Sequence, residues 1–195
     1  MRKLIVNEQM SLDGVVQAPG DPEEDRRGDF SHGGWFLDYW NEELLAPAME
    51  QMPHTEAYLF GRRTFEVFAS YWPTAPDDIP FTRSLNETAK YVASSTLQEP
   101  VPWERSSVLR GDLVAEVTAL KQAGEGNIAV LGSTEVVRTL VRHGLVDELT
   151  IMMAPVVLGG GRRLFEDDGV RTNMELVSIS TSSTGVVQAV YRPTA

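Results

Sequence analysis

The chain has 195 residues, 42% of them hydrophobic and 23% charged, and this length and composition predict a single globular domain spanning residues 1–195. Acidic residues outnumber lysine and arginine by 28 to 17, and the resulting net charge of −11 argues against nucleic acid and anionic membranes as partners. There is no cysteine, which excludes disulfides, thiolate nucleophiles and cysteine-based zinc sites. No signal peptide or membrane span is predicted, because no apolar stretch is long enough. We therefore expect a cytoplasmic protein.

The first half of the chain alternates short apolar runs with amphipathic segments. Strands are expected at 4–6, 57–60 and 90–93, since these runs are short, apolar and followed by turn residues. A helix is expected over 41–51, which either begins near Pro47 or kinks there, and another over 64–70. Residues 18–34 are rich in proline, glycine and acid and predict a loop. The segment 71–80 contains three prolines and predicts irregular structure.

The second half continues the alternation and then ends in two adjacent strands. Strands are expected at 107–109, 128–131 and 149–153, helices at 112–122 and 134–143, and an antiparallel pair at 174–180 and 185–191. Alternation of strands and helices predicts an α/β fold with a mostly parallel central sheet and helices on both faces. The closing pair predicts antiparallel strands at one edge of that sheet.

Three of the predicted strands end in small polar or glycine residues, and two of these turns lead directly into a helix. In open sheets of this class ligands bind beyond the carboxyl ends of the strands, and a helix N-terminus suits phosphate. The three turns therefore predict a groove for a dinucleotide, although such residues also simply cap helices and end strands. The turns consist of Gly61, Arg62, Arg63 and Thr64, then Ser94, Ser95 and Thr96, and then Gly132, Ser133 and Thr134.

The paired arginines Arg62 and Arg63 stand out in so acidic a chain. Arginine suits bidentate recognition of phosphate, and the 2′-phosphate of NADP is commonly met by an arginine. The alternative is a pair of surface arginines bound to helix acids such as Glu66. Residues 124–129 match the string G-x-G-x-x-A, but they precede a strand rather than follow one. We therefore reject a Rossmann fingerprint. The three histidines show no metal-ligand spacing, and no metal is expected.

Two carboxylates and one aromatic segment are candidates on the substrate side. Asp13 follows the first strand and is the first choice for acid chemistry, although an Asp-Gly pair is also ordinary turn sequence. Glu8 is the second candidate and could contact the substrate. The glycines Gly159 and Gly160 permit close backbone approach to a ligand, or form a plain turn. Trp40 belongs to a cluster, 35–40, that could stack on a heterocycle but more commonly forms core or a dimer interface.

The ordered set of motifs resembles the dihydrofolate reductase-like superfamily. It is most similar to the C-terminal reductase domain of the bifunctional riboflavin-biosynthesis deaminase/reductase (RibD), and to stand-alone relatives of that domain. The motifs that carry the resemblance lie, in family order and over nearly the whole chain, at 11–14, 59–65, 92–95, 130–133, 144–149 and 155–161. The resemblance implies a sheet of about eight strands with NADPH bound along its C-terminal edge. It also implies that the turns at 61–64, 94–95 and 132–134 hold the cofactor's phosphates.

The function that the resemblance implies is NADPH-dependent reduction of a small molecule. Hydride would reach a C=N or C=O group of a heterocyclic or sugar-derived substrate, similar to a pterin or a ribosylaminopyrimidine. The acid that dihydrofolate reductase carries in its first long helix has no assignable equivalent in 41–47, and we find no deaminase motif with zinc ligands within residues 1–195. A non-catalytic nucleotide- or pterin-binding protein, or a structural homodimer that has lost its ligand, therefore remain alternatives. A homodimer is expected in any case, because it is the commonest assembly.

Overall fold

The computed structural model describes residues 1–165, 167 and 169–194. The strands form an eight-stranded sheet in the order β4-β3-β2-β5-β1-β6-β8-β7. The chain divides into two compact units, and β1 (Leu4–Ser11) contributes to both of them. The first unit comprises Met1–Val6 and Met49–Asp147, and the second comprises Asn7–Ala48 and the described part of residues 148–195. Among the described residues, no helix has the length and apolar character needed to cross a bilayer.

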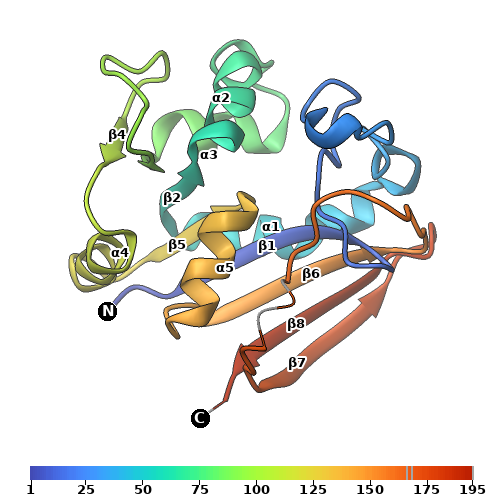
Figure 1. Cartoon of the computed structure of the whole chain (residues 1–195). Helices are drawn as coiled ribbons and strands as arrows, with labels where there is room; N and C mark the ends of the chain where they lie inside the picture. Colours follow the sequence, from blue (N-terminus) through green and yellow to red (C-terminus); the bar gives the residue numbers. More distant parts are fainter. Residues whose placement is uncertain (166, 168, 195) are drawn as a thin grey trace. The chain divides into compact units, whose positions relative to one another are not determined.

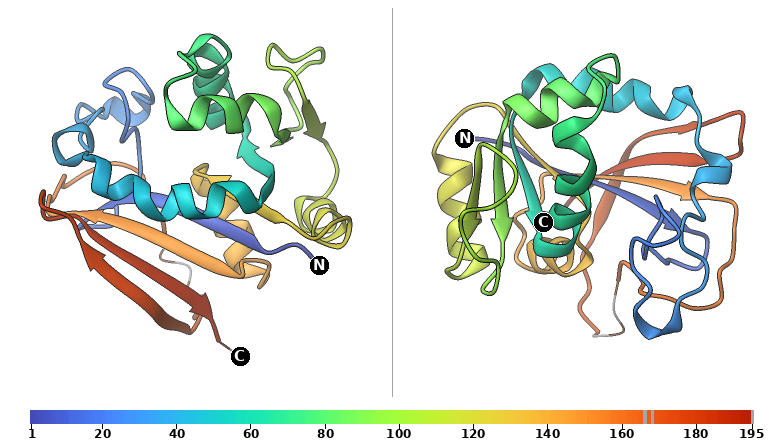
Figure 2. Two further views of the ribbon diagram at one scale, coloured as in Figure 1. Left: turned by 180° about the vertical axis from the view of Figure 1, so that it is seen from behind. Right: turned by 90° about the horizontal axis from the view of Figure 1, so that it is seen from above.

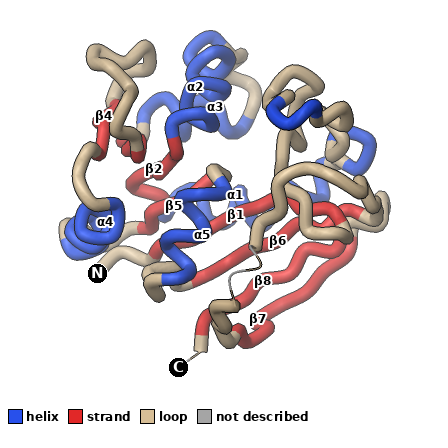
Figure 3. Tube along the Cα trace, viewed as in Figure 1, coloured by secondary structure: helices blue, strands red, loops and turns tan. Residues whose placement is uncertain are grey.

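In the first unit neighbouring strands pair in parallel, and a helix follows each of β2, β4 and β5 along the chain. Figure 3 shows these strands in red and the helices in blue. The strands are β2 (Thr55–Gly61), β3 (Ala89–Ala93), β4 (Ser106–Leu109) and β5 (Asn127–Leu131). The central strand β2 pairs in parallel with β3 on one side and with β5 on the other. Because neighbouring strands are parallel, their carboxyl ends lie at the same edge, and the turns that follow them are brought together.

The helices of the first unit pack on these strands through apolar stripes. They are α2 (Arg62–Tyr71), α3 (Pro80–Glu87), α4 (Leu113–Gln122) and α5 (Thr134–Arg142), and Figure 1 labels each of them. A core cluster joins Phe60 of β2 to Phe65 of α2, Leu85 of α3 and Trp103. The helix α5 contacts both β2 and α4. In the view from above in Figure 2, α4 lies on the other side of β3 and β4 from α2.

The second unit is built on antiparallel strands and a long, well-anchored loop. Strand β8 (Val187–Pro193) lies between β6 (Glu148–Ala154) and β7 (Met174–Thr181) and is antiparallel to both. The loop over 18–34 holds only a short 3-10 turn at Arg27–Asp29. Its Phe30 and the following Trp35 and Phe36 are buried in one core cluster with Val15 and Ala154. The indole of Trp35 donates a hydrogen bond to the Gln17 carbonyl at 2.8 Å.

The predicted fold class is confirmed, with helices and a mostly parallel sheet that ends in antiparallel strands. The structure decides between the two alternatives for 41–51: a 3-10 turn at Glu42–Leu45 is followed by α1 (Ala46–Gln51), so the helix begins next to Pro47, as the first alternative predicted, and does not kink there. One local prediction needs correction. Helix α3 was not predicted: Pro80 occupies its first turn, where proline's fixed φ favours a helix start. The assignment of one domain to the whole chain remains a prediction.

Candidate functional site

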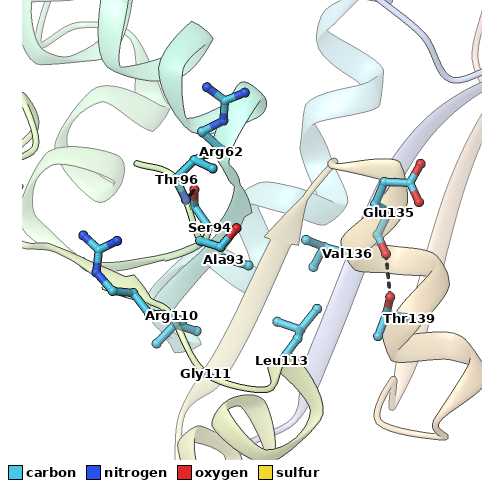
Figure 4. A pocket seen from close by; sticks show the side chains of 12 residues that line it. Arg62, Ala93, Ser94, Thr96, Arg110, Gly111, Leu113, Glu135, Val136 and Thr139 are labelled. Atoms are coloured by element: carbon cyan, nitrogen blue, oxygen red, sulfur yellow. Dashed lines mark hydrogen bonds between the residues drawn. The ribbon is translucent and has the colours of Figure 1, made fainter. Parts of the chain in front are cut away.

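A pocket of about 390 Å³ opens in the first unit, beside the carboxyl ends of its strands. Figure 4 shows Arg62, Ser94, Thr96 and Arg110 around one side of it and Val136, Glu135 and Thr139 on the other. Three of the predicted turn segments therefore face or flank a common space. Its full lining is Arg62, Ala93, Ser94, Ser95, Thr96, Leu109, Arg110, Gly111, Leu113, Glu135, Val136 and Thr139.

The turn after β2 and the turn after β5 are in direct contact. A Cβ atom built on Gly61 would lie 1.9 Å from the Ser133 Oγ and 2.7 Å from the Ser133 Cβ, so no side chain fits at Gly61. Gly132 and Ser133 both adopt positive φ, at 72° and 81°, which turns the chain sharply from β5 into α5. Glycine at position 61 is thus required by packing, and glycine at position 132 by the backbone conformation.

The helices that follow these two turns begin without a side-chain cap. Gly61, before α2, has no side chain that could cap the helix, and the Ser133 side chain, before α5, accepts no backbone N–H of its helix. The first amides of a helix have no partner within the helix, and together with the helix dipole they favour an anion. By contrast, Asp112 caps α4 by accepting the Ala115 N–H at 2.9 Å. Two adjacent, uncapped helix starts are what a phosphate-binding turn provides.

The charges around the pocket are mostly positive. Arg62 is 41% exposed and forms an ion pair with Glu66 at 3.3 Å, one turn further along α2, so the pairing expected as the alternative does occur. An exposed i,i+4 pair contributes little to stability, and its arginine can exchange that partner for a ligand. Arg110 donates to the Leu97 carbonyl at 2.8 Å. The single acid of the lining, Glu135, pairs with Arg138 at 3.3 Å.

The hydroxyl-bearing turn after β3 has a fixed shape. The Ser94 Oγ accepts the backbone N–H of Leu97 at 2.9 Å and that of Thr96 at 3.2 Å. The Ser94 N–H in turn donates to the Leu109 carbonyl at 3.1 Å, which ties this turn to the end of β4. Ser95 and Thr96 complete the rim of the pocket. The turn therefore presents hydroxyl groups, held by a stable backbone geometry, to a ligand in the pocket.

The structure brings together some predicted cofactor residues and leaves others outside the lining. Arg62, Ser94, Ser95 and Thr96 line the pocket, whereas the rest only flank it. Gly61, Thr64, Gly132, Ser133 and Thr134 form the contacting turns behind it, and Arg63 is exposed on α2. Sequence reasoning missed Arg110 and Glu135. Arg110 had a usable signal, because it follows the strand β4 as Arg62 follows β2.

In the second unit, the Asp13 side chain links the turn after β1 to the loop that contains Leu158 and Gly159. Its Oδ1 accepts the Ser11 hydroxyl at 2.7 Å and the Leu158 N–H at 3.1 Å, and its Oδ2 accepts the Gly159 N–H at 2.9 Å. Partial burial alone would raise the pKa of Asp13, but these hydrogen bonds lower it below the usual range. An ionised, fully engaged carboxylate suits loop positioning better than proton donation. The catalytic role of Asp13 remains a prediction.

Glu8 has the opposite character. Its side chain is buried within the second unit, and its Oε1 has no hydrogen-bond partner among the described residues. Burial raises the pKa of Glu8 to about 8, and the nearby Glu24 carboxylate adds to the effect. A carboxyl group in this setting keeps its proton at neutral pH, as buried acids do. Glu8 is therefore the group of this unit best suited to hold a proton.

The other predicted substrate-side residues lie in the second unit as well. Gly159 has a φ of 75° and gives its N–H to Asp13, while Gly160 has open space where a side chain would be. Trp40 is 44% exposed and lies edge-on to Phe36, with 6.5 Å between ring centroids. The neighbouring Trp35 and Phe36 are core residues. Of that aromatic cluster, Trp40 is thus the tryptophan left accessible to a ligand.

Comparisons with known proteins agree with the fold and with the motifs. Residues 2–188 match the family model of the RibD C-terminal domain. Over 193 residues the chain is 28% identical to the uncharacterized protein YyaP of Bacillus subtilis, covering 97% of this chain and 94% of that protein. A pyrimidine reductase-like protein from Corynebacterium diphtheriae superposes with a TM-score of 0.69 at 14% identity, covering 100% of this chain and 92% of that one. Dihydrofolate reductase from Enterococcus faecalis, solved with NADP(H), gives a TM-score of 0.62 at 18% identity and 99% and 97% coverage.

Proposed function

Because the chain belongs to the RibD C-terminal domain family, we propose that it is an NADPH-dependent reductase of a small heterocyclic or sugar-derived molecule. The observation that carries the proposal is the pocket of the first unit, where Arg62, Arg110 and the Ser94 turn meet beside two uncapped helix starts. A coenzyme that carries both a pyrophosphate and a 2′-phosphate needs such a combination of guanidinium groups, hydroxyl groups and free amides. A substrate similar to a pterin or a ribosylaminopyrimidine fits the family.

The residues of the pocket fit the phosphates of NADPH. Arg62 and Arg110 would hold the 2′-phosphate, since arginine commonly meets that group. The amides that begin α2 and α5, behind Gly61 and Gly132, would hold the pyrophosphate. The carboxylate of Glu135 is already paired with Arg138, which limits its repulsion of a phosphate. When bound, NADPH supplies the hydride.

Reduction of a C=N or C=O group also requires a proton for the heteroatom, and Glu8 is the proposed source. Its Oε1 is buried without a hydrogen-bond partner among the described residues, and its raised pKa keeps the proton on the carboxyl group at neutral pH. Asp13 is proposed to position the loops that carry Gly159 and Gly160. Trp40 is the proposed stacking surface for the substrate's ring. We further propose that the active protein is a homodimer.

The test measures cofactor affinity by fluorescence titration and turnover by loss of reduced-nicotinamide absorbance. Arg62→Ala should weaken NADPH binding about tenfold, since a charged hydrogen bond contributes about 1.5–3 kcal/mol when unscreened, and should leave NADH binding unchanged. Arg63→Ala is the matched control, because Arg63 is adjacent but lies outside the pocket lining. An equal loss in both variants would mean that both arginines bind phosphate, whereas no loss in either would remove the 2′-phosphate assignment.

A second candidate is a binding protein of the same fold that holds a nucleotide or pterin without turnover. It is favoured by the burial of the proposed proton source, because Glu8 is only 6% exposed and offers little access to a substrate. Tight NADPH binding with no absorbance change across a panel of pterins, ribosylaminopyrimidines and quinones would support this second candidate. Turnover with any of them that is abolished by Glu8→Gln would support the reductase and its proposed proton source.

A further inference from the structure

We propose that the free edge of β7 is the dimer interface and pairs with β7 of a second copy of this chain. The inference rests on the homodimer proposed above and assigns its surface. Among the strands that the structure describes, β7 is the last of the sheet order and has β8 as its single neighbour. One row of its backbone N–H and C=O groups therefore points away from the sheet. Such a row is a template for strand addition.

The side chains of β7 are unusually accessible for so apolar a strand. Seven of its eight residues, all but Met174, are exposed, among them Leu176 at 49%, Val177 at 41% and Ile179 at 61%. Natural edge strands are protected by lysine, proline or inward-pointing charge. Here Glu175 is the one charged residue of the strand, and neither lysine nor proline occurs in it.

The register shows that these side chains continue an apolar layer. An irregularity between Leu176 and Ser178 places Leu176 opposite Tyr191 and Ile179 opposite Ala189, so both point to one face. The same face continues on β6, where Ile151 pairs with Ala189. Ala189 and Ile151 are 5% and 8% exposed, so the layer is covered at β8 and β6 and uncovered at β7. A second β7 would extend this layer with the same side chains, which is the self-complementarity that a two-fold interface requires.

The low charge of the residues around β7 favours a second copy of this chain over a highly charged partner. The chain as a whole carries −11, yet residues 171–194 contain only two arginines and one glutamate among their charged residues. Arg192 is already paired with Glu148 at 3.2 Å. Few charged groups therefore have to be removed from water when two copies meet along β7. In an antiparallel pair, Glu175 at one end of the strand would also lie far from its symmetry mate.

The competing surface, the aromatic segment over 35–40, is largely used inside the protein. Trp35 and Phe36 are buried in the core of the second unit and are not available to a partner. Leu37, at 55% exposure, and Trp40 are the accessible apolar groups that remain there. Leu37 therefore provides a matched control for β7, since it is an exposed aliphatic residue of the same unit.

The first experiment measures molar mass in solution by light scattering over a range of protein concentrations. The unmodified protein should be a dimer, Ile179→Lys should shift its dissociation constant at least tenfold towards monomer, and Leu37→Lys should leave it unchanged. Circular dichroism checks that each variant is folded. A monomeric unmodified protein would overturn both the homodimer and its surface. A dimer that is weakened by Leu37→Lys but not by Ile179→Lys would overturn the surface alone.

The absence of native cysteine allows a second experiment that does not depend on weakening the fold. Single cysteines are introduced in turn at each exposed position of β7, from Glu175→Cys to Thr181→Cys, and, as the control, as Leu37→Cys, and each protein is oxidised with diamide. In an antiparallel pair one strand residue faces its own copy at the two-fold axis, so pairing of β7 predicts a covalent dimer from at least one strand variant and none from the control. Failure of every strand cysteine to cross-link in a dimeric protein would overturn the proposal. The reductase assignment is tested separately by NADPH turnover, so the outcome of that test does not depend on the outcome of the cross-linking experiment.

Discussion

At the scale of single residues, the contact between Gly61 and Ser133 holds the predicted phosphate-binding turns together. A methyl group at Gly61 would overlap the Ser133 side chain, and overpacking of this kind typically costs about 1–3 kcal/mol. We expect Gly61→Ala to lower the free energy of unfolding by about that amount and to weaken NADPH binding. Chemical denaturation and fluorescence titration measure the two effects.

A double-mutant cycle identifies the cause of that loss. In a Ser133→Gly background the overlapping atoms are removed, so Gly61→Ala should then cost less than about 0.5 kcal/mol. Gly160→Ala is the control for a general effect of replacing glycine, because nothing lies within 4 Å of a Cβ atom at Gly160. Equal losses with and without Ser133 would show that the contact is not responsible.

The buried carboxyl of Glu8 should make stability depend on pH. Its pKa is raised from 4.5 to about 8 in the folded protein, so between these pH values the folded state binds more protons than the unfolded state. The free energy of unfolding must therefore fall as pH rises through this window. Each unit of pKa difference corresponds to about 1.4 kcal/mol, so the loss amounts to several kcal/mol.

Glu8→Gln isolates this effect, because glutamine cannot ionise. Denaturant titrations at pH 5, 6, 7 and 8 should show a shallower decline in stability for this variant than for the unmodified protein. Glu125→Gln, at an exposed position, should leave the decline unchanged. The same slope in all three proteins would mean that Glu8 is ionised in the folded state, and would remove it as the proposed proton source.

At the scale of elements, helix α3 depends on a buried lysine that follows it. The Lys90 ammonium donates to the carbonyls of Leu85 at 2.7 Å and Thr88 at 2.9 Å, and it lies 4.6 Å from the Trp103 ring centroid. It thus satisfies carbonyl groups at the helix C-terminus that have no partner within the helix. We expect Lys90→Met to cost about 2–4 kcal/mol, while Lys3→Met, at an exposed site, costs less than about 0.5 kcal/mol. Denaturant unfolding distinguishes these outcomes.

The same helix shows what the sequence can and cannot predict about the fold. The regular elements were predicted where apolar periodicity is strong, as in β5 and α5. Helix α3 was missed because prolines precede it and its stability comes from distant partners, with Leu85 in the core cluster and Lys90 at its end. The extension of β1 to Ser11 was missed for a related reason, since a polar residue such as Glu8 becomes strand only through tertiary burial.

The candidate site, like the fold, could be predicted from the sequence only in part. The turns after β2, β3 and β5 were predictable because small residues follow apolar runs, and parallel pairing then brings the strand ends to one edge. Which arginine enters the pocket was not predictable, because Arg62 and Arg63 differ only in their angular position on α2. Arg110 comes from a loop whose position is fixed by tertiary contacts, such as its bond to the Leu97 carbonyl.

At the scale of the whole molecule, net charge opposes association while the surface of β7 favours it. Two chains of −11 each repel over a Debye length of about 30 Å at 0.01 M salt, but over only about 8 Å at 0.15 M. The residues proposed to meet, such as Leu176 and Ile179, are apolar, and salt screening does not weaken the hydrophobic contribution that their burial makes to dimer stability. The dimer should therefore tighten as salt is added.

This expectation separates an apolar interface from an ionic one. Between 0.01 and 0.15 M sodium chloride, the dissociation constant of the dimer should fall about three- to tenfold, because screening removes repulsion between the acidic surfaces. An interface built from ion pairs would weaken instead. Glu175→Gln removes the one charge of the strand and should reduce the salt dependence slightly without abolishing it, since most of the negative charge lies elsewhere. Sedimentation at several salt concentrations measures the trend, and a dissociation constant that rises with salt would contradict pairing along β7.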